Sequence, residues 1–161
     1  VVNLDEDQFR AKDYSSKESL LEYSKNTNTP FIELCIKSEL EIAKLDPEDR
    51  EMFLEDLGIE ESGIDKLSRT AYDYLGLISF LTAGHDEVKA WTIHKGTTAK
   101  KAAGKIHSDI EKGFIRAEVC KFRHLKEFGS MQKVKEKGLV TLEGKEYEVE
   151  DGDIINFRFN V

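Results

Sequence analysis

The sequence predicts two small domains of mixed structure, an α/β segment over residues 1–78 followed by an α+β roll over 79–161. The first part has a strand–helix–strand pattern and then three helices. The second part has alternating apolar runs around one helical stretch. With 161 residues, of which 39% are apolar, the chain is long enough for one domain or for two small ones.

The first domain begins with two strand segments around a helix. Val1 and Val2 read as the end of one strand, and residues 31–36 read as a short buried strand. Between them, Ser15 and Glu18 have the spacing of a capping box, so a helix of about ten residues should follow and end near Asn26. This order is typical of the edge of an α/β sheet.

Three short helices should link these strands to the second domain. Residues 39–45 are helical by composition, and Asp46 and Pro47 predict the cap and first turn of a second helix. Gly58 is a natural stop for that helix. The apolar residues that share one of its faces are Met52, Phe53 and Leu57.

A third helix should start after Ser62, which can cap it, and close at Gly76. Its apolar residues repeat every three or four positions, as the face of a helix requires. They are Ile64, Leu67, Ala71 and Leu75.

The second domain has six β-rich or alternating runs with turn signals at 143–145 and 151–153. One helical stretch, 98–107, lies between strands, and 123–137 should form short helices or loop. Strands, a crossing helix and more strands are compatible with a β-grasp fold. The runs are 77–82, 88–93, 114–122, 139–142, 147–149 and 154–159.

The charge of the chain is divided unevenly. The net charge is −8, yet residues 1–78 have 19 Asp and Glu against 9 Lys and Arg, while 79–161 have 13 against 15. Residues 89–137 include 13 basic and 5 acidic residues. A basic stretch in an acidic chain indicates a phosphate-rich partner such as RNA. The alternative is a solvated surface that is merely rich in lysine.

The candidates for nucleic-acid contact are the basic residues of this stretch, with three of them around the predicted helix 98–107. Lysine ammonium groups and helix N-termini suit phosphate, which positions a partner without reading its sequence. The candidates are His94, Lys95, Lys100, Lys101, Lys105, Lys112, Arg116, Lys121 and Arg123.

Several classes of protein are disfavoured. No run of eighteen apolar residues indicates a membrane span, so we expect no membrane partner. The N-terminus lacks the pattern of a secretory signal, and the absence of a starting Met suggests a piece of a longer protein. Cys35 and Cys120 lie far apart, so we expect reduced, buried thiols in a cytoplasmic protein.

The sequence contains no site for a nucleoside triphosphate. A P-loop needs a glycine, four residues and then Gly-Lys followed by Ser or Thr. The Gly-Lys pairs at 104–105 and 144–145 lack both the first glycine and the hydroxyl residue. Nothing in this chain is expected to hold a triphosphate with Mg²⁺ in the usual way.

Two further clusters have ordinary explanations. A metal or acid–base site could be formed by His107, Asp109 and Glu111. We expect these residues to form a helix-to-strand connection instead, because metal ligands must converge on one point. Cys120 and His124 have no spacing that predicts a nucleophile and base. We therefore expect no metal site and no catalytic residue. Trp91 either packs in the core or offers a stacking surface, and the core is favoured.

Three stretches in a fixed order carry a resemblance. They are the strand with Trp91 and Thr92, the run 111–119, and the ending 157–161, Phe-Arg-Phe-Asn-Val. Together they resemble the C-terminal region of the YchF family, the Obg-like P-loop ATPases. Lys89 stands where that family commonly has Arg, which is a minor departure.

The resemblance implies a fold for each domain. Residues 1–78 would be the C-terminal part of the nucleotide-binding (G) domain, an α/β remnant of a P-loop NTPase domain. Residues 79–161 would be a TGS domain with an α+β, ubiquitin-like β-grasp fold. A cut through the α/β domain would expose a sheet edge and an apolar face, through which the chain could self-associate.

The resemblance also implies a base-contacting rim. The Asn-x-x-Glu pattern of Asn3 and Glu6 resembles the family's variant of the Asn-Lys-x-Asp base reader, which accompanies a preference for ATP. Cys35 and Ile36 would belong to the family's last base-contacting loop. Ile36 is larger than the residues common at that position, which puts the details of base packing in doubt.

The implied function is that of a fragment of a ribosome-associated ATP- or GTP-binding NTPase. The full-length family uses ATP or GTP with Mg²⁺, whereas this fragment should hold no cofactor. TGS domains of threonyl-tRNA synthetase and stringent-response enzymes fit an RNA-facing role by analogy. We expect the fragment to bind the ribosome or RNA without turnover. The alternatives are a protein-interaction or regulatory domain without RNA contact, and a ubiquitin-like carrier, which the lack of a Gly-Gly ending disfavours.

Overall fold

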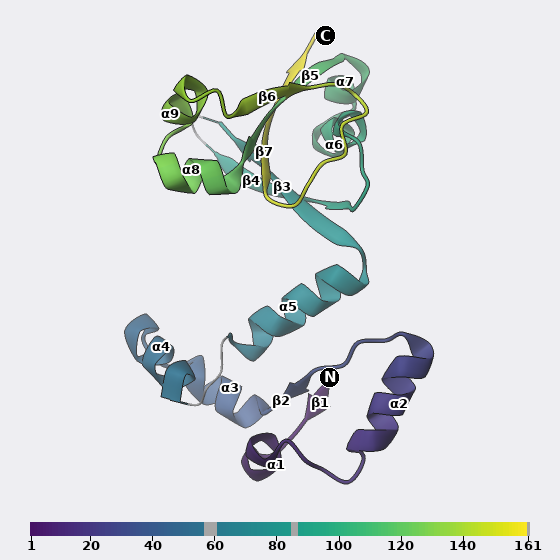
Figure 1. Cartoon of the computed structure of the whole chain (residues 1–161), viewed down its shortest axis with the longest axis vertical. Coiled ribbons are helices and arrows are strands. Elements are labelled where there is room, and N and C mark those ends of the chain that lie inside the picture. The colour runs from purple at the N-terminus through teal and green to yellow at the C-terminus, as the bar shows by residue number, and fades with distance from the viewer. Residues whose placement is uncertain (57–60, 85–86, 161) are drawn as a thin grey trace. The chain divides into compact units, whose positions relative to one another are not determined.

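The computed structural model describes residues 1–56, 61–84 and 87–160 (Figure 1). The chain divides into two compact units, Val1–Tyr74 and Leu75–Val161. This division lies a few residues before the domain boundary expected after residue 78. No helix in the described ranges is long and apolar enough to cross a membrane.

Unit 1 contains a short parallel pair of strands, β1 (Val2–Asn3) and β2 (Glu33–Leu34). The backbone N–H of Val2 donates to the carbonyl of Ile32, and that of Leu4 to the carbonyl of Leu34, both at 2.8 Å. The strand predicted over 31–36 is shorter than expected, because the next helix already begins at Ile36.

The first two helices are α1 (Glu6–Ala11) and α2 (Lys17–Thr27). The capping box predicted at Ser15 is wrong: the cap of α2 is Ser16, and its side chain makes no capping hydrogen bond. The capping box lies instead at α1, where Asp5 Oδ1 accepts from the N–H of Gln8 at 2.8 Å and Gln8 Oε1 accepts from that of Asp5 at 3.2 Å.

Three helices follow β2, namely α3 (Ile36–Ile42), α4 (Pro47–Asp56) and α5 (Gly63–Tyr74). The predicted start at Pro47 is confirmed. Ser62 caps α5, since its Oγ accepts from the N–H of Asp65 at 3.3 Å. Leu57 and Gly58, the expected end of α4, lie outside the described residues, as does the side chain of Phe53.

The core of unit 1 is small and tightly closed around Gly63. The N–H of Gly63 donates to Glu39 Oε1 at 2.9 Å. A Cβ at this position would lie 2.7 Å from both that oxygen and a methyl carbon of Leu34. Only glycine fits here without a shift, so α5 starts directly against β2 and α3. The buried apolar residues are Leu4, Ile32, Leu34, Cys35 and Ile42.

Unit 2 is built on a five-stranded mixed sheet in the order β4-β3-β7-β5-β6. The last strand of the chain lies between β3 and β5, parallel to β3 and antiparallel to β5; β3–β4 and β5–β6 are antiparallel pairs. The strands are β3 (Leu77–Ala83), β4 (Val88–His94), β5 (Phe114–Lys121), β6 (Val140–Glu143) and β7 (Asp153–Phe159).

Five of the six strands predicted for this unit are therefore confirmed, and the one predicted over 147–149 is wrong. The backbone groups of that segment bond to the start of a helix instead of a strand. The carbonyl of Tyr147 accepts from the N–H of Ala99 at 2.7 Å, and the N–H of Val149 donates to the carbonyl of Thr97 at 3.0 Å. Only a single bridge, between Thr98 and Glu148, has β geometry.

Four helices accompany the sheet. They are α6 (Ala99–Ile106), α7 (Ser108–Lys112), α8 (Phe122–Phe128) and α9 (Met131–Glu136). The helix predicted over 98–107 and the short helices predicted within 123–137 are confirmed, whereas α7 was expected only as a connection. Helices α6 and α7 lie on one side of the sheet, and α8 and α9 lie on the other (Figure 1).

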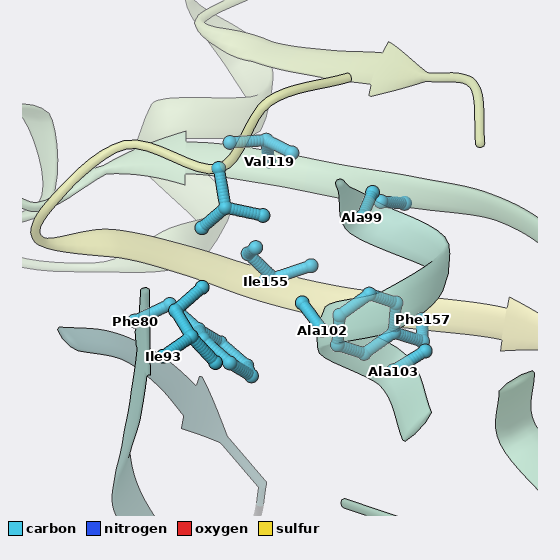
Figure 2. Packing of buried hydrophobic residues seen from close by; sticks show 10 residues of the cluster. Phe80, Ile93, Ala99, Ala102, Ala103, Val119, Ile155 and Phe157 are labelled. Atoms are coloured by element: carbon cyan, nitrogen blue, oxygen red, sulfur yellow. The ribbon is translucent and has the colours of Figure 1, made fainter. Parts of the chain in front are cut away.

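The two faces of the sheet have separate cores because neighbouring residues of a strand point to opposite faces. On β7, Ile155 belongs to the cluster beneath α6, and Ile154 to the cluster beneath α8 and α9. In the first cluster the rings of Phe80 and Phe157 meet edge to face, with centroids 6.0 Å apart (Figure 2).

Helix α6 packs against the sheet through alanines. Ala99, Ala102 and Ala103 are fully buried and face the cluster (Figure 2). Their small side chains let the helix approach the strands closely, so the position of its outer face is set by the core.

Replacing Phe80 with Ala should destabilise unit 2 by about 3–5 kcal/mol, because the change leaves a cavity under α6. Urea unfolding followed by the fluorescence of Trp91, the chain's one tryptophan, measures this. Phe159, which is 43% exposed, supplies the control: Phe159→Ala should cost about 1 kcal/mol or less. Equal losses for the two variants would contradict this account of the core.

Candidate functional sites

Two loops of unit 1 meet where the parallel strands β1 and β2 end. Asn3 is the last residue of β1, and Cys35 and Ile36 follow β2. Asn3 Oδ1 accepts a hydrogen bond from the N–H of Ile36 at 3.1 Å. The carboxyl ends of neighbouring parallel strands share one edge of a sheet, where α/β folds commonly bind ligands. Asn3 thus joins the two loops that were expected to contact a base.

Glu6 and Cys35 complete this pair of loops. Glu6 opens α1, and its Oε1 lies 3.1 Å from Lys37 Nζ; this hydrogen bond raises the pKa of Lys37. The buried Cys35 accepts from Ser38 Oγ through its sulfur at 3.2 Å. Ile36 is half exposed. A carboxylate and a half-exposed apolar side chain suit the edge and face of a base, and the base-binding role of these residues stays a prediction.

Helix α6 carries three lysines, Lys100, Lys101 and Lys105, and we call these three residues the α6 lysine surface. All three are exposed, and none has an ion pair within the described residues. Lys101 and Lys105 are four positions apart and therefore share a side of the helix. The buried alanines occupy the side of the helix opposite Lys101 and Lys105, whereas Lys100 lies about 100° around the helix from Lys101.

The first turn of α6 is closed by the protein itself. The N–H of Ala99 donates to the carbonyl of Tyr147 at 2.7 Å, and that of Lys100 to the carbonyl of Lys145 at 3.3 Å. Phosphate at this helix would therefore meet lysine side chains, while these two N–H groups at the N-terminus are already bonded.

The other basic candidates are not gathered with α6. Lys95, Lys112, Arg116 and Arg123 are exposed but belong to a turn, α7, β5 and α8. Lys112 Nζ lies 3.9 Å from a carboxylate oxygen of Asp109. Of the nucleic-acid candidates, Lys100, Lys101 and Lys105 thus share one helix, and these four lie on separate elements.

Lys121 has a structural role that the sequence did not reveal. Its ammonium lies 2.7 Å from Oδ1 of the fully buried Asp153, 2.9 Å from Glu150 and 3.1 Å from the Tyr147 hydroxyl. The hydroxyl of Tyr147 also donates to Asp153 Oδ2 at 2.8 Å. An ammonium held by three partners is poorly suited to bind phosphate, which favours a structural role for the half-buried Lys121 over the predicted nucleic-acid contact.

The protonation of this cluster follows from its contacts. Burial by itself lowers the pKa of Lys121, but hydrogen bonds to Asp153, Glu150 and Tyr147 outweigh it and raise the pKa well above its usual range. Burial, with a further contribution from Asp153, raises the pKa of Tyr147 to about 12. The ammonium stays charged and the phenol stays neutral throughout the physiological range.

A second network, around Glu118, was missed by sequence reasoning. This carboxylate is 8% exposed; it accepts from Arg158 Nε at 2.7 Å and from Asn156 Nδ2 at 3.2 Å, and Lys135 Nζ lies 3.8 Å away. The hydrogen bond from Asn156, followed by the bonds and charge of Arg158, lowers the pKa of Glu118. Alternation along β5 and β7 could have indicated these residues, but not their register.

The residues considered for metal or nucleophilic chemistry have other partners. His107 Nδ1 accepts from the N–H of Asp109 at 3.2 Å as the cap of α7. Glu111 packs against Gly104, where a Cβ would lie 2.3 Å from its carboxylate. Burial raises the pKa of the Cys120 thiol, which suits an inert residue. Across 1–56, 61–84 and 87–160 no three His, Cys, Asp or Glu residues could hold a metal ion.

Trp91 occupies the edge of the core below α6. Its ring is partly buried against the cluster of Phe80 and Phe157, and its Nε1 donates to Thr82 Oγ1 at 2.9 Å. Lys89 Nζ lies 4.4 Å from the ring centroid. These contacts favour a core position over an open stacking surface.

A family model of the C-terminal region of YchF GTPases, described as a protein of unknown function (DUF933), matches residues 77–160. The chain belongs to the YchF family. The resemblance seen in the sequence is thereby confirmed.

Curated relatives of this YchF-family chain match along its whole length. It is 50% identical over 164 residues to the "Ribosome-binding ATPase YchF" of Bacillus subtilis and 44% identical over 161 residues to the protein of that name from Haemophilus influenzae. Both alignments cover 100% of this chain and 44% of the relative. The chain thus spans less than half the length of the curated relatives that it matches.

Solved structures agree with the family. The Schizosaccharomyces pombe YchF GTPase is similar with a TM-score of 0.80 and 31% identity, over 98% of this chain and 42% of that one. A GTP-binding protein from Pyrococcus horikoshii shows a similar fold, with a TM-score of 0.63 and 17% identity. The match covers 94% of this chain and 43% of that protein's chain.

Replacing Lys121 with Met should destabilise unit 2 of this YchF-family chain by about 2–4 kcal/mol, because Asp153 then stays buried without its cation. Because the pKa of Lys121 is raised on folding, the loss should be constant at neutral pH. It should shrink only as pH rises above about 10, where the lysine of the unfolded chain begins to deprotonate, and it should disappear when the pH passes the higher pKa of the folded state. Urea unfolding at several pH values measures this.

The matched control is Lys126→Met on α8, an exposed lysine for which we expect a change within about 0.5 kcal/mol. If Lys121→Met were as stable as this control, the buried ion pair would not support the fold.

Proposed function

We propose that this chain is the C-terminal part of a YchF-like, ribosome-associated NTPase, and that unit 2 binds ribosomal RNA through the α6 lysine surface. One observation carries the proposal: three exposed lysines without ion pairs, in the described structure, stand on a helix whose other side is buried. The printed name of the relatives, ribosome-binding ATPase, supports a ribosomal partner.

Alanine packing gives this surface a defined position. Because Ala99, Ala102 and Ala103 are fully buried, the backbone that carries the lysines is fixed against the sheet. Lysine is a compact, hydrated point charge that contacts phosphate without reading bases. The surface therefore suits the backbone of RNA, and its binding should weaken steeply with salt.

Unit 2 is proposed to be a TGS domain with a ubiquitin-like β-grasp fold. A hairpin, β3–β4, is followed by a covering helix, α6, and the last strand lies in the centre of the sheet, parallel to β3. This arrangement supports the β-grasp assignment. TGS domains in other RNA-dependent proteins support an RNA-facing role by analogy only.

Unit 1 is proposed to be the remnant of the nucleotide-binding domain. Asn3, Glu6, Cys35 and Ile36 would form the base-side rim, and the Asn3–Ile36 hydrogen bond supports this by joining both loops. In the longer family proteins, a P-loop would bind the phosphates of ATP or GTP together with Mg²⁺. This sequence has no P-loop. We propose a cytoplasmic location, where ribosomes are found.

Changing Lys100, Lys101 and Lys105 together to Glu should weaken co-sedimentation with ribosomes by about tenfold or more at moderate salt, because each lysine lost removes a phosphate contact. The dependence on salt should become shallower by roughly one logarithmic unit per lost contact. Lys25, Lys44 and Lys66 of unit 1, changed together to Glu, give the same change of charge elsewhere and should have little effect. Equal weakening by both triple variants would refute the assignment to α6.

The purified chain should not hydrolyse ATP or GTP above background with Mg²⁺ present, because it has no P-loop to hold the phosphates. Phosphate release in the presence and absence of ribosomes measures this. Turnover that follows the chain through purification would show that the chain holds a phosphate site after all.

A further inference from the structure

Two arginines stand directly opposite each other on the sheet of unit 2. Arg116 of β5 is the register partner of Arg158 of β7. Both are exposed. Like charges directly opposite on neighbouring strands are destabilising. A surface pair of this kind therefore calls for an explanation beyond the fold.

The arginine pair lies on the face of the sheet that α6 does not cover. Along β7, Ile155 and Phe157 contact the α6 side, so Asn156 and Arg158 point to the other face. Along β5, Ala117 and Val119 contact the α6 side, and Arg116 takes the opposite face for the same reason. This surface is thus separate from the α6 lysine surface.

Among the described residues, Glu118 is the carboxylate that pairs with the cations of this face. Glu118 accepts from both Nε and Nη2 of Arg158, and Lys135 of α9 lies 3.8 Å from its other oxygen. Arg116 has no ion pair or side-chain hydrogen bond within the described residues. Arg158 and Lys135 thus share the Glu118 carboxylate, and Arg116 is the cation of this face whose charge no described carboxylate compensates.

The local backbone presents Arg116 in a distinct way. The pairing of β5 with β7 shifts register between Phe114 and Arg116, as at a β-bulge. Bulges commonly re-aim a side chain next to a functional site. The side chain of Arg158 is fixed by Glu118, so one arginine is held in place while the other remains available.

We propose that Arg116 and Arg158 together bind a phosphate group of an RNA backbone, as a second RNA contact of unit 2; this rests on the proposed function. Arg116 presents a planar fork of donors that matches two phosphate oxygens, while Arg158, whose Nε and Nη2 are bonded to Glu118, adds a fixed positive charge and its remaining N–H donors beside it. Residues directly opposite on adjacent strands are about 5 Å apart, which lets both side chains reach one phosphate. Lys135, on a neighbouring element, can meet the next phosphate of the strand.

An RNA backbone suits this face better than a single acidic group. The cations come from β5, β7 and α9, so a partner with regularly repeated charges matches them. With the α6 lysine surface on the other face, unit 2 would contact RNA from both sides of its sheet. An acidic protein segment is the alternative that the experiment must separate.

The experiment measures binding of a short fluorescent poly-uridine RNA to the full chain by anisotropy over a salt series, beside thermal unfolding. Arg116→Ala should weaken binding by about tenfold and make the salt dependence shallower by roughly 0.7. Its melting temperature should be unchanged or higher, because a like-charged pair is removed. Arg116→Lys, which keeps the charge but not the fork, should bind with intermediate affinity. The control, Lys44→Ala in unit 1, should bind as the unmodified chain does.

Three outcomes would overturn the inference: unchanged RNA binding by Arg116→Ala, a lowered melting temperature that accounts for its loss of binding, or competition by polyglutamate as strong as by unlabelled RNA. The triple α6 variant, measured in the same assay, separates the two proposals. Loss of binding in that variant alone supports the α6 surface and refutes the arginine pair. Loss in Arg116→Ala alone supports the arginine pair and refutes the α6 surface.

Discussion

The position of β7 between β3 and β5 is the constraint on which unit 2 depends. This strand supplies Ile155 and Phe157 to the core beneath α6 and Ile154 to the core beneath α8 and α9. It begins with Asp153, whose buried carboxylate is held by Lys121 at the end of β5. Strand β7 therefore contributes to both cores. The positions of the surfaces on the two faces of the sheet depend on this strand.

The two basic surfaces follow from the same strand in different ways. Beneath α6, small and apolar side chains fix the helix and leave its lysines outside. On the opposite face, the register of β7 with β5 sets Arg158 against Arg116 and brings Asn156 and Arg158 to Glu118. The net charge of the whole chain is negative although unit 2 carries these basic surfaces, because most of the negative charge belongs to residues 1–78. The proposal of an RNA partner rests on this distribution of charge and not on the net charge.

The sequence predicted the strands of unit 2 and helix α6 because alternation and helical spacing are local patterns. It failed where long-range contacts decide. The segment 147–149 looks like a strand, but its backbone bonds to the start of α6. Ser15 and Glu18 have capping-box spacing, yet Asp5 and Gln8 form the box. The sequence could not predict the ion pairs of Lys121 and Arg158, because their partners lie 32 and 40 positions away and depend on strand register.

The central claim, that unit 2 is the RNA-binding part of this chain, is tested most directly by NMR of the isotope-labelled full chain titrated with RNA. Amide shifts should change over 99–106 and around Arg116 and Arg158, at RNA concentrations that leave the signals of residues 1–74 unchanged. Shifts confined to unit 1, or spread evenly over both units and abolished by modest salt without preference for these residues, would contradict the claim.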